Sequence, residues 1–142
     1  MKRIMPNLSV ADLVKHFAVK GWSLAGGRKV VHAVDGVSFD IKDGITFGLV
    51  GESGSGKTTV GRLVLRLIAP TAGSILLDGM NIAELEGEAM RKFRQENQII
   101  FQDPHASLNP RKSIRQILER PFMIHDSLSD EAIESRIYAL LE

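Results

Sequence analysis

A glycine-rich segment near the middle of the chain constrains the fold more than any other feature. It follows an apolar run at residues 45–50 and precedes a stretch with helical spacing of apolar residues. Glycines between a buried strand and a helix are typical of a loop that wraps a phosphate group, because they let successive backbone N–H groups turn inward. The pattern predicts an α/β fold whose parallel sheet includes residues 45–50. The segment reads Gly51-Glu52-Ser53-Gly54-Ser55-Gly56-Lys57-Thr58.

The residue types in this loop predict nucleotide binding. A helix that begins at the end of the loop would offer unpaired N–H donors and a partial positive charge to an anion. Lys57 would add a full charge for the β- and γ-phosphates, and the Thr58 hydroxyl is suited to bind Mg²⁺. Thr59 is placed to reach another phosphate oxygen. The predicted nucleotide-binding residues are Gly51, Glu52, Ser53, Gly54, Ser55, Gly56, Lys57, Thr58 and Thr59, with Thr58 also a metal ligand.

Short strands and helices are predicted around the loop. Residues 1–36 favour an antiparallel region, with strands at 8–17 and 29–34 separated by glycines at positions 21, 26 and 27. Alternating apolar residues predict a further strand at 37–41, followed by a turn at Asp43-Gly44. After the loop, the apolar stripe predicts a helix that continues to Ile68 and stops before Pro70 and Gly73. Strands are expected at 74–77 and 98–101, with a helix at 84–95 between them.

The last forty residues favour a loop and two helices. Turn-forming residues dominate positions 103–111, and apolar spacing predicts a helix at 113–120 that Pro121 ends. Ser129 is suited to be the N-cap of a second helix, in which residues 133, 137, 140 and 141 form an apolar stripe. No C-cap residue follows, so we expect the chain to stop inside this helix.

Composition excludes several classes of function. The net charge of +1, with both signs scattered, provides no basic surface of the kind that attracts nucleic acid, and we expect no nucleic-acid partner. The chain has no cysteine, and its apolar runs are much shorter than a membrane span or a signal-peptide core. Its four histidines are scattered without metal-binding spacing, so we expect surface residues at His16, His32, His105 and His125.

Several segments resemble a known family. Gln98-Ile99-Ile100-Phe101-Gln102-Asp103-Pro104 is similar to the Q-loop of ABC ATPases. The segments 33–39, 48–54 and 101–111 together resemble the oligopeptide/dipeptide importer branch of that family. The resemblance implies a cytoplasmic ATPase that binds ATP and Mg²⁺, pairs head to tail with a second ABC ATPase subunit, and drives a transmembrane permease. It also implies a peripheral location on the cytoplasmic face of the membrane, held there by the permease.

The same resemblance implies further site residues and a domain plan. Gln102 would bind Mg²⁺ or lie near the attacking water, and the segment after it would contact the permease subunits. Phe17 takes the place of the aromatic residue that stacks on adenine, with Trp22 as a rival. Residues 1–142 would be one incomplete nucleotide-binding domain. It would comprise a mainly antiparallel β region at 1–47, a core from the phosphate loop to the Q-loop at 48–102, and the start of a helical subdomain at 103–142.

Three motifs of the resembled family do not occur in these 142 residues: the Leu-Ser-Gly-Gly-Gln signature, the Walker B strand with its catalytic glutamate, and the switch histidine. The run from Ser74 to Asp78 imitates a Walker B strand, but Gly79 follows where glutamate is needed, so we interpret Asp78 as a turn residue. Phosphoryl transfer to water needs such a carboxylate. We therefore expect no catalytic residue in this chain and no ATP hydrolysis by the chain alone.

Two alternatives remain open from the sequence. One is a soluble ABC ATPase without a permease, in which the segment after Gln102 would face a soluble partner. The other is a P-loop kinase or GTPase with a chance likeness to the Q-loop. The second alternative lacks support from a guanine-reading Asn-Lys-x-Asp element, which does not occur in the sequence.

Overall fold

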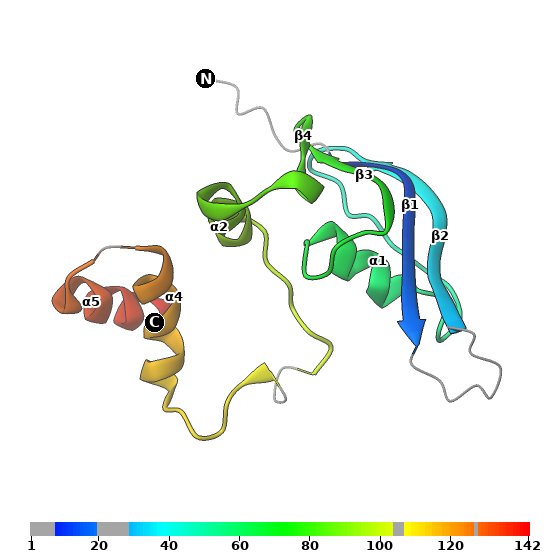
Figure 1. Ribbon diagram of the computed structural model, residues 1–142. Helices are drawn as coiled ribbons and strands as arrows, with labels where there is room; N and C mark the ends of the chain where they lie inside the picture. The colour runs from blue at the N-terminus through cyan, green and yellow to red at the C-terminus, as the bar shows by residue number, and fades with distance from the viewer. Residues whose placement is uncertain (1–7, 20–28, 104–106, 127) are drawn as a thin grey trace. The chain divides into compact units, whose positions relative to one another are not determined.

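The chain forms two compact units, Met1–Met90 and Arg91–Glu142, each described below by itself. The computed structural model (Figure 1) describes residues 8–19, 29–103, 107–126 and 128–142. Trp22, His105 and the three predicted loop glycines at positions 21, 26 and 27 lie outside the described residues. Among the residues that are described, no helix has both the length and the apolar character needed to span a membrane. The domain boundaries expected from the sequence, after residues 47 and 102, stay predictions.

An antiparallel sheet dominates the first unit, with strand order β2-β1-β3-β4. The strands are β1 (Leu8–Val19), β2 (Lys29–Ile41), β3 (Ala72–Leu77) and β4 (Met80–Asn81). The antiparallel N-terminal region expected from the sequence is therefore confirmed. The two strands predicted at 29–34 and 37–41 are one continuous strand, because Gly36 adopts a φ of 71° and lets β2 bulge without breaking.

A second irregularity between β1 and β2 sets which side chains share a face. Lys15 pairs with Val34, whereas the next residue of β1, His16, pairs with His32. Ala33 is therefore the extra residue of a bulge in β2. The bulge changes the alternation of side chains along β2, which matters for both sites described below.

The core of the first unit lies between the sheet and a short helix. Helix α1 (Lys57–Val64) runs along the concave side of the curved sheet (Figure 1). Its residue Leu63 is fully buried, as are Leu13 of β1 and Ile75 of β3. Burial of each such side chain contributes about 1.5–3 kcal/mol relative to leaving it in water. The sheet and α1 therefore hold the start of the helix, and the phosphate loop before it, in place.

Helix α1 is shorter than the apolar pattern predicts. It ends at Val64, although the predicted stripe continues to Ile68. Arg66 adopts a left-handed conformation with φ of 52°, and the N–H of Leu67 donates to the carbonyl of Arg62 at 2.8 Å. This arrangement closes a helix C-terminus. The guanidinium of Arg66 also donates two hydrogen bonds to the carbonyl of Ala83, at 2.8 and 3.2 Å, which compensate for the unusual backbone.

The two strands expected at 45–50 and 98–101 are not formed. No strand in the described part of the chain pairs with either segment. Val50 is 90% exposed and Ile100 is 94% exposed. A strand that is apolar on both faces is stable only when neighbouring strands and helices cover it. The stacked rings of Phe39 and Phe47, 5.1 Å apart between centroids, show that the first segment still packs against β2.

The turn between β3 and β4 confirms the interpretation of Asp78. Asp78 and Gly79 have φ angles of 52° and 77°, which suit a tight hairpin turn. A short 3₁₀ helix, η1 (Ile82–Glu84), follows β4, and helix α2 (Gly87–Glu96) begins three residues later than the predicted start at 84. The run from 74 to 78 is therefore part of a hairpin.

Helices make up most of the second unit. Ser113 caps α4 (Ile114–His125) with a full capping box, and Ser129 caps α5 (Asp130–Leu141) as predicted. Pro121 does not end the first of these helices, because proline removes only one N–H bond and the ladder resumes with the N–H of Asp126 bonded to the carbonyl of Phe122. Of the stripe predicted on α5, Ile137 is buried, whereas Leu140 and Leu141 are exposed.

Candidate nucleotide-binding site

The predicted phosphate loop is folded as a compact turn before α1. The N–H of Ser55 donates to the carbonyl of Glu52 at 3.2 Å, and Gly54 and Gly56 have φ angles of 82° and 92°. Side-chain-bearing residues rarely adopt such angles. The two glycines therefore have a conformational reason for their positions, and the curled backbone expected from the motif is present.

Close packing gives Gly56 a second reason to be glycine. A Cβ atom at this position would lie 2.3 Å from the carbonyl oxygen of Ala33, the bulge residue of β2. It would also lie 3.7 Å from a methyl group of Val34, which is buried. The main chain of β2 and the end of the loop are thus in direct contact, and this contact fixes the loop against the sheet.

Lys57 folds back over the loop that precedes it. Its ammonium group donates to the carbonyl of Gly51 at 2.8 Å and also to the carbonyl of Glu52. The hydroxyl of Ser55 lies 3.4 Å away from the same nitrogen. A phosphate group at the loop would find this ammonium within reach, since a lysine side chain moves by rotation about its flexible stem.

The start of α1 has no side-chain cap. Gly56 is the N-cap residue, and no acidic residue occupies the first turn. The backbone N–H groups there are of the kind that bind anions at helix N-termini. Thr58 is exposed and Thr59 is half-buried in this first turn, so both hydroxyls belong to the same short region as the loop glycines.

Phe17 lies on β1 and is 39% exposed. The ammonium of Lys15 lies over its ring, 5.1 Å from the ring centroid. These two residues are two positions apart on a strand and share one face. Lys15 pairs with Val34, whose side chain lies next to Gly56, so this is the face of the sheet that carries the loop. Phe17 is therefore available for stacking on that face.

Gln102 is exposed and belongs to the second unit. Its role toward Mg²⁺ stays a prediction. The residue after it, Asp103, accepts a hydrogen bond on its carbonyl from the Ser107 hydroxyl at 2.8 Å.

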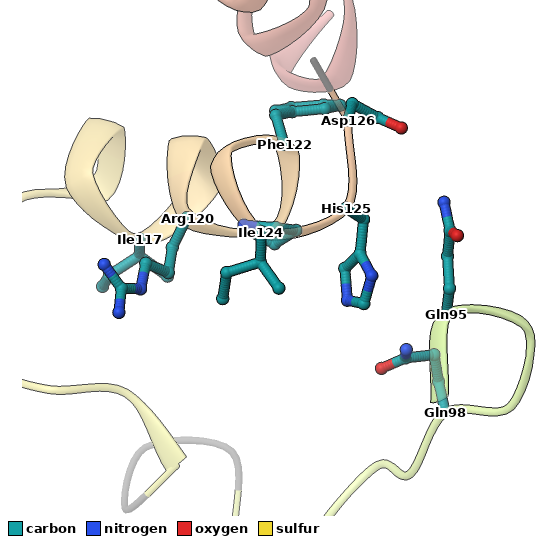
Figure 2. A pocket seen from close by; sticks show the side chains of 9 residues that line it. Gln95, Gln98, Ile117, Arg120, Phe122, Ile124, His125 and Asp126 are labelled. Carbon is teal, nitrogen blue, oxygen red and sulfur yellow. The ribbon is translucent and has the colours of Figure 1, made fainter. Parts of the chain in front are cut away.

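A pocket of about 560 Å³ in the second unit contains none of the predicted nucleotide-binding residues. Figure 2 shows His125, at the end of α4, beside Gln95 and Gln98. Among the described residues, the Nδ1 atom of His125 is buried without a hydrogen-bond partner. No sequence pattern indicates this pocket, because it forms between the end of α2 and one side of α4.

The sequence reasoning also missed a cluster of three side chains on the sheet. His16 and His32 face each other across β1 and β2, and Asp35 lies beside both. His16 and His32 are accessible to solvent, as expected of surface residues, but they are not scattered, because strand pairing brings together residues that are far apart in sequence. The signal that could have revealed this cluster is the pattern of two strands joined by a loop, because it predicts antiparallel pairing of the strands that carry His16 and His32.

Taken together, the loop, its lysine and the antiparallel sheet beside it define a partial P-loop ATPase domain. Two solved structures of the ATP-binding cassette MJ0796 share this fold, both described as dimeric and one as bound to ADP and Pi. Their TM-scores are 0.73 and 0.69, each at 24% identity. The matches cover 94% and 91% of this chain, and 55% and 53% of those chains.

The sequence model of the ABC transporter family matches residues 34–142, and the chain belongs to that family. This decides against the kinase or GTPase alternative. The chain is 48% identical to the putative oligopeptide transport ATP-binding protein YkfD of Bacillus subtilis, over 87% of this chain and 36% of that protein. It is 45% identical to the oligopeptide transport ATP-binding protein AppF of the same organism, over 94% and 41%. Identity to the dipeptide transport ATP-binding protein DppF of Escherichia coli is 43%, over 96% and 40%.

These relatives are much longer than the present chain, which spans 36–41% of their length and matches their N-terminal part. The resemblance to the oligopeptide/dipeptide importer branch is confirmed.

Proposed function

We propose that this chain binds ATP together with Mg²⁺, as part of the energising subunit of a peptide-type ABC importer. The observation that carries the proposal is the curled loop at Gly51–Gly56 with Lys57 folded over it, at the uncapped start of a helix. Backbone N–H groups and one ammonium group are the donors that a triphosphate needs. The peptide-transport names of the relatives support the choice of importer.

Within this proposal each site residue has a distinct role. The N–H groups of residues 51–56 and the Lys57 ammonium hold the β- and γ-phosphates, and Thr59 holds another phosphate oxygen. Bound Mg²⁺ supplies positive charge next to the phosphates, and the Thr58 hydroxyl and the Gln102 side chain are its protein ligands. Phe17 stacks on the adenine, which is worth about 1–3 kcal/mol for a base on an aromatic ring.

The partners follow from the same assignment. The segment after Gln102, from Asp103 to Met123, contacts transmembrane permease subunits, and a second ABC ATPase subunit pairs with this one. The protein lies at the cytoplasmic face of the membrane through those contacts. Crosslinking through residues 103–123 tests this part, and recovery of only soluble proteins would favour a soluble ABC ATPase instead.

Binding of ATP by the 142-residue chain tests the core of the proposal. Replacing Lys57 by Ala removes charged hydrogen bonds, so we expect affinity for ATP to fall by about 1.5–3 kcal/mol. Titration calorimetry with ATP and GTP, with and without Mg²⁺, measures the change and the base preference.

Lys92→Ala is the matched control, because Lys92 is an exposed lysine on α2 whose ion pair with Glu96, at 3.9 Å, contributes little. Unchanged ATP affinity in Lys57→Ala, or an equal loss in Lys92→Ala, would contradict the proposed site.

A further inference from the structure

A three-residue cluster on the sheet has the composition of a transition-metal site. His16 Nε2 lies 3.3 Å from one carboxylate oxygen of Asp35, and His32 Nδ1 lies 3.7 Å from the other. One ligand atom from each of the three residues can be chosen so that all lie within 4.8 Å of one another. Two imidazoles and a carboxylate form a ligand set that suits zinc and similar divalent ions.

The separations between these atoms suit a bound ion. A tetrahedral zinc ion about 2.0–2.1 Å from each ligand atom requires those atoms to lie about 3.3–3.4 Å apart. The distance of 3.3 Å from His16 Nε2 to one oxygen of Asp35 matches this value, and His32 Nδ1 lies 3.7 Å from the other oxygen of the same carboxylate. The three ligand atoms of one set lie within 4.8 Å of one another, so rotation of the side chains can bring them to the separation that zinc requires. The imidazole rings of His16 and His32 lie side by side, with centroids 3.8 Å apart and planes tilted by 36°, so both rings lie in the same small region as Asp35.

The backbone holds the three residues in position. His16 and His32 are directly paired across the antiparallel strands β1 and β2, and the bulge at Ala33 keeps Asp35 on their face. Ligands that come from paired strands are held more firmly than ligands on loops. The side chains remain accessible, because His16, His32 and Asp35 are 28%, 56% and 68% exposed. Water can therefore occupy the remaining coordination position.

We propose that His16, His32 and Asp35 form a binding site for one divalent transition-metal ion, of which zinc is the best fit. The ligand set carries one negative charge when both imidazoles are neutral, which complements a divalent cation. Imidazole nitrogen selects zinc, nickel, cobalt or copper over Mg²⁺, which prefers oxygen ligands. The proposal is independent of nucleotide binding, because adjacent residues on a strand point to opposite faces and Phe17 lies on the face that carries the loop.

Zinc titration of the untagged, EDTA-treated chain tests the site, since a polyhistidine tag would itself bind metal. We expect one zinc ion per chain, measured by calorimetry without nucleotide and in the presence of excess Mg²⁺. Even a residue that only orients a ligand changes metal affinity by about 10- to 100-fold, so loss of a direct ligand should weaken binding by roughly tenfold or more. His16→Gln and Asp35→Asn each remove one ligand with little change in size.

The matched controls are His125→Gln in the second unit and Asp40→Asn, an exposed aspartate on the same strand as Asp35. Both should bind zinc as the wild type does. Absence of micromolar zinc binding in the wild type, or undiminished binding in both ligand variants, overturns the proposal and leaves only an ion pair. Circular dichroism checks that each variant folds. Cobalt absorption of the wild type provides a second measurement, in which bands of nitrogen-ligated cobalt are expected and a purely aqueous spectrum counts against the site.

Discussion

Gly56 illustrates how one residue can serve both the backbone and the packing of a site. Its φ of 92° places it where L-residues are strained, and its α-carbon faces the carbonyl of Ala33 with no room for a Cβ. The sequence motif predicts the first requirement, because phosphate loops need curled glycines. It does not predict the second, since the contact depends on a bulge in β2 that no local pattern announces.

Replacing Gly56 by Ala should therefore abolish ATP binding. The left-handed backbone alone costs alanine about 1–2 kcal/mol, and relief of the clash with Ala33 requires the loop to move. Gly61→Ala is the control, because Gly61 lies inside α1 and an added methyl group there would meet open space. That change should stabilise the helix by about 0.5–1 kcal/mol and leave ATP affinity intact. Calorimetric titration with ATP compares them, and retained binding in Gly56→Ala would contradict the loop assignment.

Phe17 permits a test that separates the base from the phosphates. Phe17→Ala should weaken ATP binding by about 1–3 kcal/mol, because base stacking on an aromatic ring is lost. Binding of inorganic tripolyphosphate should not change, since it has no base. Trp22→Ala is measured in parallel by the same competition titration. If the loss of ATP affinity occurs in Trp22→Ala and not in Phe17→Ala, the assignment of Phe17 is wrong.

Among the secondary-structure elements, the sequence predicts those that depend on local interactions, such as helix caps, turns and strand alternation. The N-caps of α4 and α5, the turn at Asp78 and the antiparallel strands depend on residues close together in the chain, or on alternation within a strand. The segments at 45–50 and 98–101 are different. Their apolar character correctly indicates a preference for burial, but a strand also needs neighbours, and none pairs with them in the part of the chain that the structure describes.

The capping box of α4 allows a prediction at this scale. Ser113 accepts from the N–H of Gln116 at 3.3 Å and its own N–H donates to the Gln116 side chain at 3.0 Å. Ser113→Ala should destabilise the helix by about 0.5–2 kcal/mol, seen as faster amide exchange in the first turns of α4. Ser135→Ala, at an exposed position inside α5, should cause no loss of protection. Unchanged exchange in Ser113→Ala would show that the cap contributes nothing to the helix.

At the scale of the whole molecule, binding and hydrolysis make different demands on a chain. In our proposal the phosphate loop supplies the binding groups, whereas phosphoryl transfer to water also needs a residue that positions the attacking water. The sequence predicts nucleotide binding from a motif that is present, and it predicts the lack of hydrolysis only from the motifs that do not occur in these 142 residues. The family match confirms the class of protein, and the length of the relatives leaves their full activity as a proposal for this chain.

We therefore expect the purified 142-residue chain to bind ATP without Mg²⁺-dependent release of phosphate. A continuous phosphate-release assay measures this, with a full-length relative as the positive control. Turnover that persists in the wild type and disappears in Lys57→Ala would contradict the expectation, because the variant excludes a contaminating ATPase as the source.

The bulge in β2 has a consequence for how this region can change during evolution. Ala33 acts through its main-chain oxygen and through its place in the strand register, and neither depends on its methyl group. Exchange of Ala33 for another small residue should be tolerated. Deletion of this one position would instead remove the bulge, because His32 and Val34 would become neighbours that still pair with His16 and Lys15. The main-chain carbonyl that lies against Gly56 would then be lost. Chain length here is under stronger constraint than residue identity.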